Sequence, residues 1–362
     1  MDMPTPQRRS YENIEISPGD LELLISQEEP DLGELSYFSR LRDGWLEGGG
    51  IDIPDFIHSL KGEARSILEL APQTLLAYTK DSFVGDGRLE YMPGNPQNPE
   101  LPAIYFYPGF AANEASVPLV SALNQLGYDV YVQVSPFMQD IKKHEGIAGN
   151  SINEIRKKNN YPGIIGIGWS MGGLAIGGYL KRNPYRHGLD TFISMGTPNL
   201  GTIVAYLGFF AKSARQMMPM SDYVLELRNL EFDEETKIAT VTPTNDPIST
   251  PPETSLSNSH SYNVIAGKFS HVQMMVSERS PYWLDFLIRT PAKELDKISE
   301  NRPFRETIAM KFFSAVMPPS LFNYIGLSDI KAFTVGQNYN LIIAGRNDPL
   351  VKAKTNGYHN AN

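Results

Sequence analysis

The fold of this 362-residue chain is decided by the stretch Gly166-Ile167-Gly168-Trp169-Ser170-Met171-Gly172-Gly173. The stretch follows the apolar pair Ile164-Ile165 and precedes a segment in which apolar residues recur at helical spacing. A serine with glycine two residues away on both sides, between a strand and a helix, is the pattern of a nucleophile elbow, a tight turn that lifts the serine oxygen above the sheet. The pattern also occurs by chance, so the prediction depends on partners elsewhere in the chain.

Apolar runs alternate with amphipathic segments on both sides of this turn. The runs that predict buried strands are 103–107, 128–134, 163–168, 191–195, 238–242 and 262–266, and those that predict helices are 115–126, 150–158, 174–182 and 282–288. A hairpin is predicted before them, from 75–79 and 88–91. Strands separated by helices at this spacing indicate βαβ units. We therefore predict an α/β fold with a mostly parallel sheet and helices on both faces.

Composition excludes several classes of protein. The formal net charge is -9, with 32 Lys and Arg against 41 Asp and Glu, which argues against a nucleic-acid partner. The chain has no cysteine, which excludes disulfides, thiolate metal sites and a cysteine nucleophile. No segment resembles a metal site, a phosphate-binding loop or a dinucleotide fingerprint, so we expect no cofactor and no metal.

Targeting signals are not visible in the sequence. Residues 1–20 are polar and lack the apolar core of a secretory signal peptide. No run reaches the roughly 20 apolar residues that a transmembrane helix needs. We expect a cytoplasmic protein with no transmembrane segment. Nothing in the sequence indicates an oligomeric state.

A serine hydroxyl becomes an effective nucleophile only when a base takes its proton, and imidazole is the usual base. After a nucleophile elbow, an acid and then a histidine follow along the chain, each past the carboxyl end of a strand. His271 has this placement after the strand predicted at 262–266, and Asp246 has it after the strand predicted at 238–242. We therefore predict Ser170 as nucleophile, His271 as base and Asp246 as the acid that orients it.

A second aspartate is an alternative acid. Asp348 follows the apolar run 341–344, yet only His359 comes after it, with no strand predicted between them. Asp246 and His271 are preferred because they complete the strand order. Taken singly, these residues have ordinary interpretations, such as a turn serine or an aspartate that forms a turn before proline. Their order along the chain carries the prediction.

The tetrahedral intermediate of acyl transfer needs two backbone N–H donors, which form an oxyanion hole. Met171, at the start of the helix after Ser170, is predicted to supply one donor. Phe110, in the loop after the strand at 103–107, is predicted to supply the other, and Gly109 lets the backbone approach the substrate closely.

Four segments are distinctive: Tyr107-Pro108-Gly109-Phe110, Gly168-Trp169-Ser170-Met171-Gly172-Gly173, Met195-Gly196-Thr197-Pro198-Asn199-Leu200-Gly201 and Ala214-Arg215-Gln216-Met217-Met218-Pro219-Met220-Ser221-Asp222. Together they resemble the α/β-hydrolase superfamily, and within it the bacterial lipase and esterase branch. The resemblance covers about residues 75–290. It implies an α/β-hydrolase fold with a helical lid over about 199–235, and the same triad and oxyanion hole. Pro108, Trp169 and Asn199 stand where histidines are common in the family, outside the predicted triad.

Three regions are predicted along the chain. Residues 1–72 form a helical N-terminal extension, 73–290 the catalytic domain, and 291–362 a C-terminal extension of unknown role. The apolar stretch 203–220, within the lid, is either core or the wall of an acyl pocket. The side chains predicted to line that pocket are Leu207, Phe209, Phe210, Met217 and Met218, among which methionine adapts well to flexible ligands.

These patterns predict a carboxylic ester hydrolase of the esterase or lipase type. Its substrate is a small-molecule ester or lipid with a hydrophobic acyl group, cleaved through an acyl-enzyme, with transient contact to a lipid surface. Two alternatives remain open. One is an acyltransferase that uses the same triad, and the other is a hydrolase scaffold without activity that serves as a binding protein. Neither the length of the acyl chain nor the alcohol is indicated.

Overall fold

The computed structural model describes residues 87–343, except 96, 111–113, 137, 159–160, 244–245, 250, 258–260, 268–269, 278 and 304–307. The predicted N-terminal extension at 1–72, the strand at 75–79 and the segment with Asp348 and His359 lie outside the described residues.

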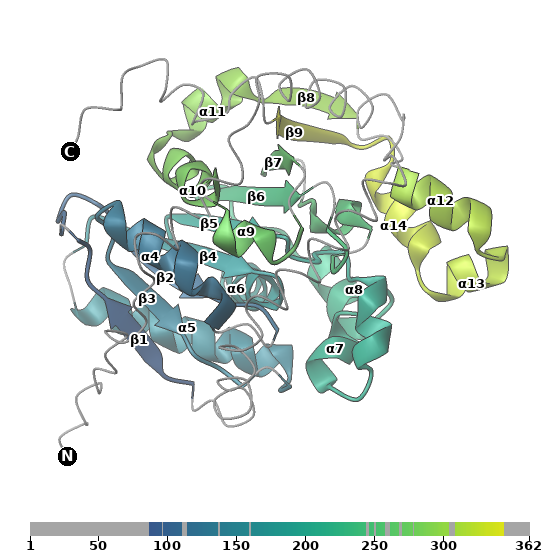
Figure 1. Cartoon of the computed structure of the whole chain (residues 1–362), viewed down its shortest axis with the longest axis horizontal. Helices are drawn as coiled ribbons and strands as arrows, with labels where there is room; N and C mark the ends of the chain where they lie inside the picture. The colour runs from purple at the N-terminus through teal and green to yellow at the C-terminus, as the bar shows by residue number, and fades with distance from the viewer. Residues whose placement is uncertain are drawn as a thin grey trace, which may run out of the picture.

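A nine-stranded sheet runs through the described part of the chain, in the order β1-β3-β2-β4-β5-β6-β7-β9-β8 (Figure 1). Its strands are β1 (Leu89–Met92), β2 (Ala103–Tyr107), β3 (Val130–Gln133), β4 (Ile164–Trp169), β5 (Thr191–Met195), β6 (Lys237–Pro243), β7 (Tyr262–Gly267), β8 (Glu300–Pro303) and β9 (Asn338–Ile343). Strands β1 and β8 pair antiparallel at the two edges, and every pairing between them is parallel. The predicted mostly parallel α/β sheet is confirmed.

The sequences of the central strands are nearly continuous apolar runs because helices cover both faces of the sheet. Every residue of β2, β3, β4 and β5 is buried. Side chains alternate between the faces, so Ile104 and Phe106 of β2 join one core cluster, whereas Tyr105 and Tyr107 join the other.

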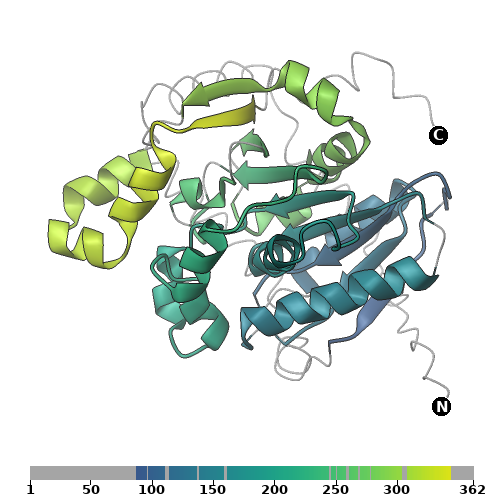
Figure 2. The same cartoon turned by 180° about the vertical axis from the view of Figure 1, so that it is seen from behind.

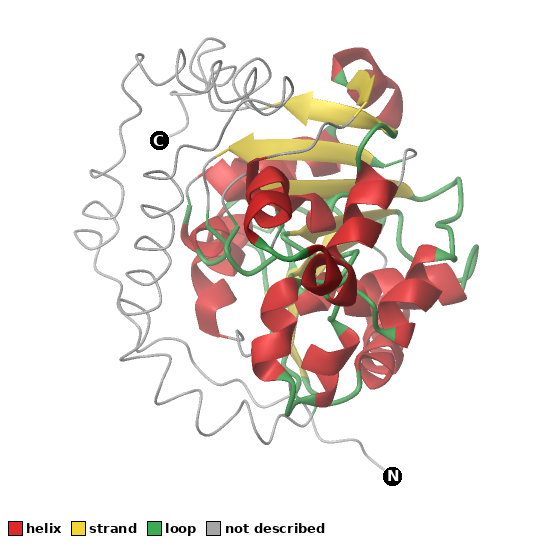
Figure 3. Ribbon diagram, turned by 90° about the vertical axis from the view of Figure 1, so that its right-hand side faces the viewer, coloured by secondary structure: helices red, strands yellow, loops and turns green. Residues whose placement is uncertain are grey.

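One face is covered by α4 (Val117–Gln125), α9 (Gln273–Val276), α10 (Arg279–Arg289) and α11 (Ala292–Ile298). The opposite face is covered by α5 (Ile141–Lys158) and α6 (Met171–Arg182), seen from behind in Figure 2. In Figure 3 the strands lie across the molecule with the helices packed around them. Helix α5 begins well before the predicted start at 150, because Gly146 and Gly149 obscure its helical pattern. At Gly149 a side chain would collide with Tyr179 of α6.

Two groups of short helices stand beside the carboxyl ends of the strands. Between β5 and β6 the chain forms η3 (Ile203–Gly208), α7 (Lys212–Gln216) and α8 (Asp222–Arg228), and between β8 and β9 it forms α12 (Ile308–Val316), α13 (Pro319–Tyr324) and α14 (Leu327–Thr334). The single turns η2 (Glu114–Ser116) and η4 (Pro252–Ser255) complete the described elements. The two groups touch, since Arg228 of α8 is 2.9 Å from Asp329 of α14.

The sheet does not end at β7, as the apolar runs predicted. Strand β9 pairs in parallel with β7, and β8 pairs with β9, so two strands from beyond residue 290 continue the sheet. Leu341 and Ile342 of β9 are fully buried. A parallel strand such as β7, apolar on both faces, would expose a row of unpaired backbone groups if it formed the edge. The predicted division at 290 stays a prediction, but residues on both sides of it share one sheet.

The turn around Ser170 packs closely against the end of β2, so a larger side chain there should destabilise the protein. A Cβ at Gly172 would collide with the backbone carbonyl oxygens of Tyr107 and Pro108, whereas a Cβ at Gly146 in α5 meets nothing within 4 Å. We expect Gly172→Ala to lower the free energy of unfolding by about 3 kcal/mol or more. The control Gly146→Ala should raise it by about 1 kcal/mol, through better helix propensity. Urea unfolding of both variants measures this difference, and equal tolerance of the two alanines would contradict the contact at Gly172.

Candidate active site

Ser170 occupies the turn between β4 and α6 in a strained backbone conformation. Its φ is 54° and its ψ is -126°, a region that residues with a side chain rarely adopt. Three contacts hold the turn. The Ser170 N–H donates to the Met195 carbonyl at 2.8 Å, and the glycines of the motif leave no room for a Cβ, with Gly168 against the backbone of Gly173 and Gly173 against the Thr197 side chain. Strain that the surroundings enforce in this way is typical of functional residues.

Asp246 and His271 form a buried pair past the carboxyl ends of β6 and β7. The His271 Nδ1 lies 2.7 Å from the Asp246 Oδ2, and the two residues are 4% and 2% exposed. The other oxygen, Oδ1, accepts the backbone N–H groups of Ile248 and Ser249, both at 2.8 Å. Because an ionised carboxylate only accepts, the imidazole proton belongs on Nδ1, which leaves the lone pair on Nε2.

Gly196 connects this pair to the turn at Ser170. A Cβ at Gly196 would stand 3.1 Å from the Asp246 Oδ2 and 3.2 Å from the His271 Nδ1. The preceding residue, Met195, is the one whose carbonyl accepts the Ser170 N–H. The structure therefore brings the three residues of the predicted triad to one edge of the sheet, where β4, β5, β6 and β7 end.

The residues predicted to form the oxyanion hole lie on either side of Ser170. Met171 follows it as the first residue of α6 and is 1% exposed. Phe110 follows Gly109, at which a Cβ would stand 2.7 Å from the Ser170 Cβ and 3.4 Å from its Oγ. The loop after β2 thus passes so close to Ser170 that there is no room for a side chain at Gly109.

The side chains predicted to line an acyl pocket fall into two groups. Met217 is buried and Met218 half-buried, and both pack in one apolar cluster with Phe110, Met138, Met171, Leu174, Ala205, Tyr223, Leu227, Leu230 and Ile141. Three others lie at the surface, at the end of η3 and just after it, and are 80%, 64% and 65% exposed: Leu207, Phe209 and Phe210. The two methionines thus share a cluster with both predicted oxyanion residues, and contact between the other three and an acyl chain stays a prediction.

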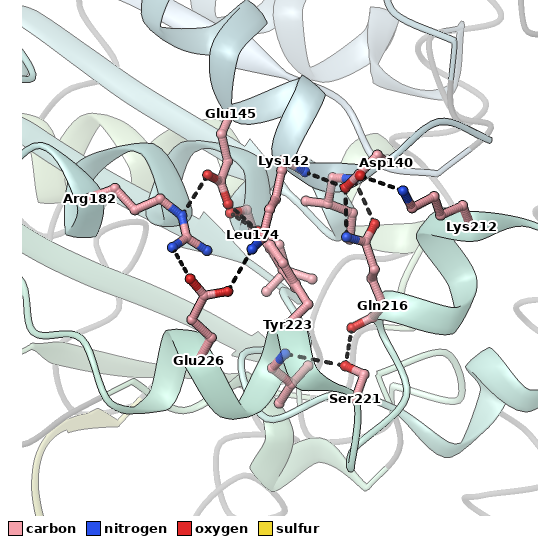
Figure 4. A network of polar contacts seen from close by, with 12 residues as sticks. Asp140, Lys142, Glu145, Leu174, Arg182, Lys212, Gln216, Ser221, Tyr223 and Glu226 are labelled. Atoms are coloured by element: carbon pink, nitrogen blue, oxygen red, sulfur yellow. Dashed lines mark hydrogen bonds and ion pairs between the residues drawn. The ribbon is translucent and has the colours of Figure 1, made fainter.

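An ionic network of half-buried and exposed side chains around the buried Glu145 fixes α8 to the core helices (Figure 4). Arg182 of α6 pairs with Glu145 of α5, with Nε 2.8 Å from Oε2, and with Glu226 of α8. Lys142 of α5 binds the same Glu226 at 2.8 Å. The Tyr223 hydroxyl donates to the Glu145 Oε1 at 2.9 Å, and burial raises the pKa of that carboxyl.

A second network fixes α7 to the start of α5, also drawn in Figure 4. The Gln216 amide donates to the Asp140 Oδ1 and accepts the Ile141 N–H, both at 2.7 Å, and Lys212 lies 2.7 Å from the Asp140 Oδ2. Burial acts in the opposite direction, but the hydrogen bonds from Lys212 and Gln216 lower the pKa of Asp140 to about 2. Helices α7 and α8 are thus attached to the core at several points, whereas the residues around 207–210 project from it.

Sequence patterns did not reveal the support beneath the loop after β2. The Tyr107 hydroxyl lies 2.6 Å from the His144 Nδ1 and 3.1 Å from the Ser135 Oγ. Burial lowers the pKa of His144 to about 4, so this imidazole stays neutral near pH 7. The contact joins β2 to α5, and no local spacing signals a pair so distant in sequence.

A second buried His–Asp pair lies at the opposite end of the strands. The His187 Nε2 is 2.6 Å from the Asp233 Oδ2, and the backbone N–H of Leu189 donates to the His187 Nδ1. His187 precedes β5 and Asp233 precedes β6, so this pair sits at the amino ends of the parallel strands. It fixes two loops there, far from the turn that carries Ser170.

Within the residues that the structure describes, no group of three or more His, Cys, Asp or Glu side chains could hold a metal ion. In the same part of the chain, no helix has the length and apolar character needed to cross a membrane.

Comparisons with known proteins found similarity to solved structures only. No family model and no curated protein matches the chain. Several solved structures are similar to it. A lipase from Bacillus licheniformis, BlEst2 in its mature form, is 16% identical, with a TM-score of 0.48 over 56% of this chain and 98% of the lipase. Est1E from Butyrivibrio proteoclasticus is 12% identical, with a TM-score of 0.41 over 56% of this chain and 94% of its own. An α/β serine hydrolase homologue from Coxiella burnetii is 16% identical, with a TM-score of 0.36 over 57% and 92%. The described residues form the mostly parallel α/β fold that the sequence predicts.

Proposed function

We propose that this protein is a serine hydrolase that cleaves carboxylic esters with a hydrophobic acyl group through an acyl-enzyme. The observation that carries the proposal is the buried hydrogen bond between Asp246 and His271, beside the strained turn of Ser170. A histidine held by a buried carboxylate next to a serine in a strained turn is the arrangement that activates a hydroxyl.

Each side chain has a distinct role in the proposed reaction. The Ser170 Oγ attacks the ester carbonyl while the His271 Nε2 takes its proton. Asp246 keeps the imidazole in the tautomer with a proton on Nδ1 and stabilises the imidazolium that forms. The proton then passes to the departing alcohol, and a water molecule activated by the same histidine hydrolyses the acyl-enzyme.

Charge on the carbonyl oxygen is proposed to be stabilised by the backbone N–H groups of Met171 and Phe110. Met171 begins α6, a helix end whose free N–H groups and dipole favour negative charge. The loop with Gly109 stands against Ser170 from the other side, which supports Phe110 as the second donor.

The preference for a hydrophobic acyl group rests on the apolar cluster around Phe110, Met171, Met217 and Met218. The side chains of Met217 and Met218, packed with those of Phe110 and Met171, favour an alkyl chain over a polar one. The exposed Leu207, Phe209 and Phe210 are proposed to contact a longer chain or a lipid surface.

The activity test is hydrolysis of p-nitrophenyl esters of graded acyl length. We expect turnover by the wild type, with kcat/KM rising from acetate to a longer alkyl ester as more methylene groups are buried. Ser170→Ala should lower kcat by at least about 10⁴-fold because the nucleophile is lost. Turnover that survives in Ser170→Ala, or its absence for every ester in the wild type, would contradict the proposal. An alcohol acceptor that diverts most of the acyl group from water would identify an acyltransferase instead.

The identity of the acid is tested by a matched pair of substitutions. Asp246→Asn should lower kcat by about 10⁴-fold, since an amide at this position favours the wrong imidazole tautomer. Asp348 lies in an Asn-Asp-Pro segment like that of Asp246, so Asp348→Asn serves as the control. It should leave kcat within about twofold of the wild-type value. Retained activity in Asp246→Asn, with loss in Asp348→Asn, would assign the acid to the other segment.

A further inference from the structure

Trp169 precedes Ser170 in the sequence, but its side chain contacts the histidine. It is the last residue of β4, is 2% exposed and belongs to the apolar cluster on the α4 and α10 face of the sheet. Its indole ring lies against the imidazole of His271, with ring centroids 5.3 Å apart and ring planes inclined at 34°. The contact links the end of β4 directly to the predicted base.

The geometry of this contact suits a cation–π interaction. The two rings are tilted by 34°, closer to parallel than to perpendicular, and their centroids lie within the roughly 6 Å over which an aromatic ring attracts a cation. Tryptophan has the most strongly attracting face of the aromatic residues. In the proposed reaction His271 becomes positively charged when it takes the serine proton, so the attraction is stronger in the transition state than in the ground state.

The indole nitrogen offers no other reason for a tryptophan at this position. Its Nε1 is buried and, in the described part of the chain, has no hydrogen-bond partner. Buried polar groups are usually hydrogen-bonded, and a leucine or phenylalanine would fill an apolar site without leaving a donor unpaired. The face of the ring against His271 is therefore the contact that distinguishes tryptophan from those residues here.

The surroundings of His271 strengthen such an attraction. The loop after β6 brings the Asp246 carboxylate to Nδ1 at 2.7 Å, whereas Gly196 after β5 and Met274 of α9 bring no charge. His271 is 4% exposed, and a cation–π interaction is strongest when water is excluded.

We propose that Trp169 is a positioning residue whose ring face orients the His271 imidazole and stabilises its protonated form while Ser170 attacks. This inference rests on the proposed function, because it assigns a part to Trp169 in the same reaction.

Fluorination of the Trp169 ring tests the inference without creating a cavity in the core. Tryptophans carrying one, two and three ring fluorines, placed at position 169 by site-specific incorporation, weaken the attraction of the face stepwise with little change in shape. We expect kcat for a p-nitrophenyl ester to fall stepwise, by about tenfold over the series, with KM unchanged. The midpoint of the ascending limb of kcat/KM against pH should move about one unit to lower pH, since a less stabilised imidazolium loses its proton more readily. The same series at Trp283, 1% exposed and packed edge-on against Phe286, is the control and should change neither quantity.

The outcomes separate this inference from the proposed function. If esters are hydrolysed and neither kcat nor the midpoint follows fluorination at position 169, Trp169 only fills space and the inference is wrong. If no ester is hydrolysed, the proposed function fails. NMR titration of the His271 ring in the fluorinated series still tests the contact in that case, because it needs no turnover, and a constant midpoint would overturn it.

Discussion

The site depends on how closely the turn at Ser170 packs against its neighbours. Three segments meet there: a Cβ at Gly172 would collide with the backbone of Tyr107 and Pro108, one at Gly173 with the Thr197 side chain, and one at Gly109 with the Ser170 side chain. This crowding holds Ser170 at a φ of 54°, a conformation that a serine would leave if the surroundings relaxed. The position of the hydroxyl is thus fixed by the fold, at the cost of strain in the backbone.

The burial of the Asp246–His271 pair also depends on close packing at the ends of the strands. With Gly196 in place of a larger residue, the loops after β6 and β7 close onto the end of β5, and the Asp246–His271 pair is buried there. A buried carboxylate needs hydrogen bonds, and Asp246 receives them from the imidazole and from two backbone N–H groups. These hydrogen bonds orient the pair in the absence of a substrate, which is the preorganisation that the proposed acyl transfer requires.

The helices between β5 and β6 combine firm attachment with an exposed apolar segment. Ionic contacts from α5 and α6 hold α8, and Gln216 with Lys212 holds α7 to the start of α5. The predicted lid over about 199–235 therefore contains parts anchored to the core as well as the exposed Leu207, Phe209 and Phe210.

The sequence predicted the elements that depend on the pattern of neighbouring residues. Apolar runs predicted β2 and β5 to the residue, because strands buried on both faces tolerate few polar side chains. The triad of Ser170, Asp246 and His271 was predicted from the order in which partners follow a nucleophile elbow and from the ends of the predicted strands; it stays a prediction, and the structure places Asp246 beside His271. Contacts between distant segments left no such signal. The pairing of β9 with β7, the support of Tyr107 by His144 and the ring contact of Trp169 with His271 each join residues that no local pattern relates. The apolar run at 341–344 looks in isolation like a strand that leads to an acid, but its place in the sheet, beside β7, was not predicted.

The role of Ser170 as nucleophile is tested most directly by trapping the acyl-enzyme. The protein is mixed rapidly with a p-nitrophenyl ester, quenched in acid and digested, and the peptide that carries the acyl group is identified by mass spectrometry. A burst of p-nitrophenol together with an acyl group on the oxygen of Ser170 is the expected result. The absence of any acyl-peptide during turnover, or its appearance on another residue, would contradict the assignment.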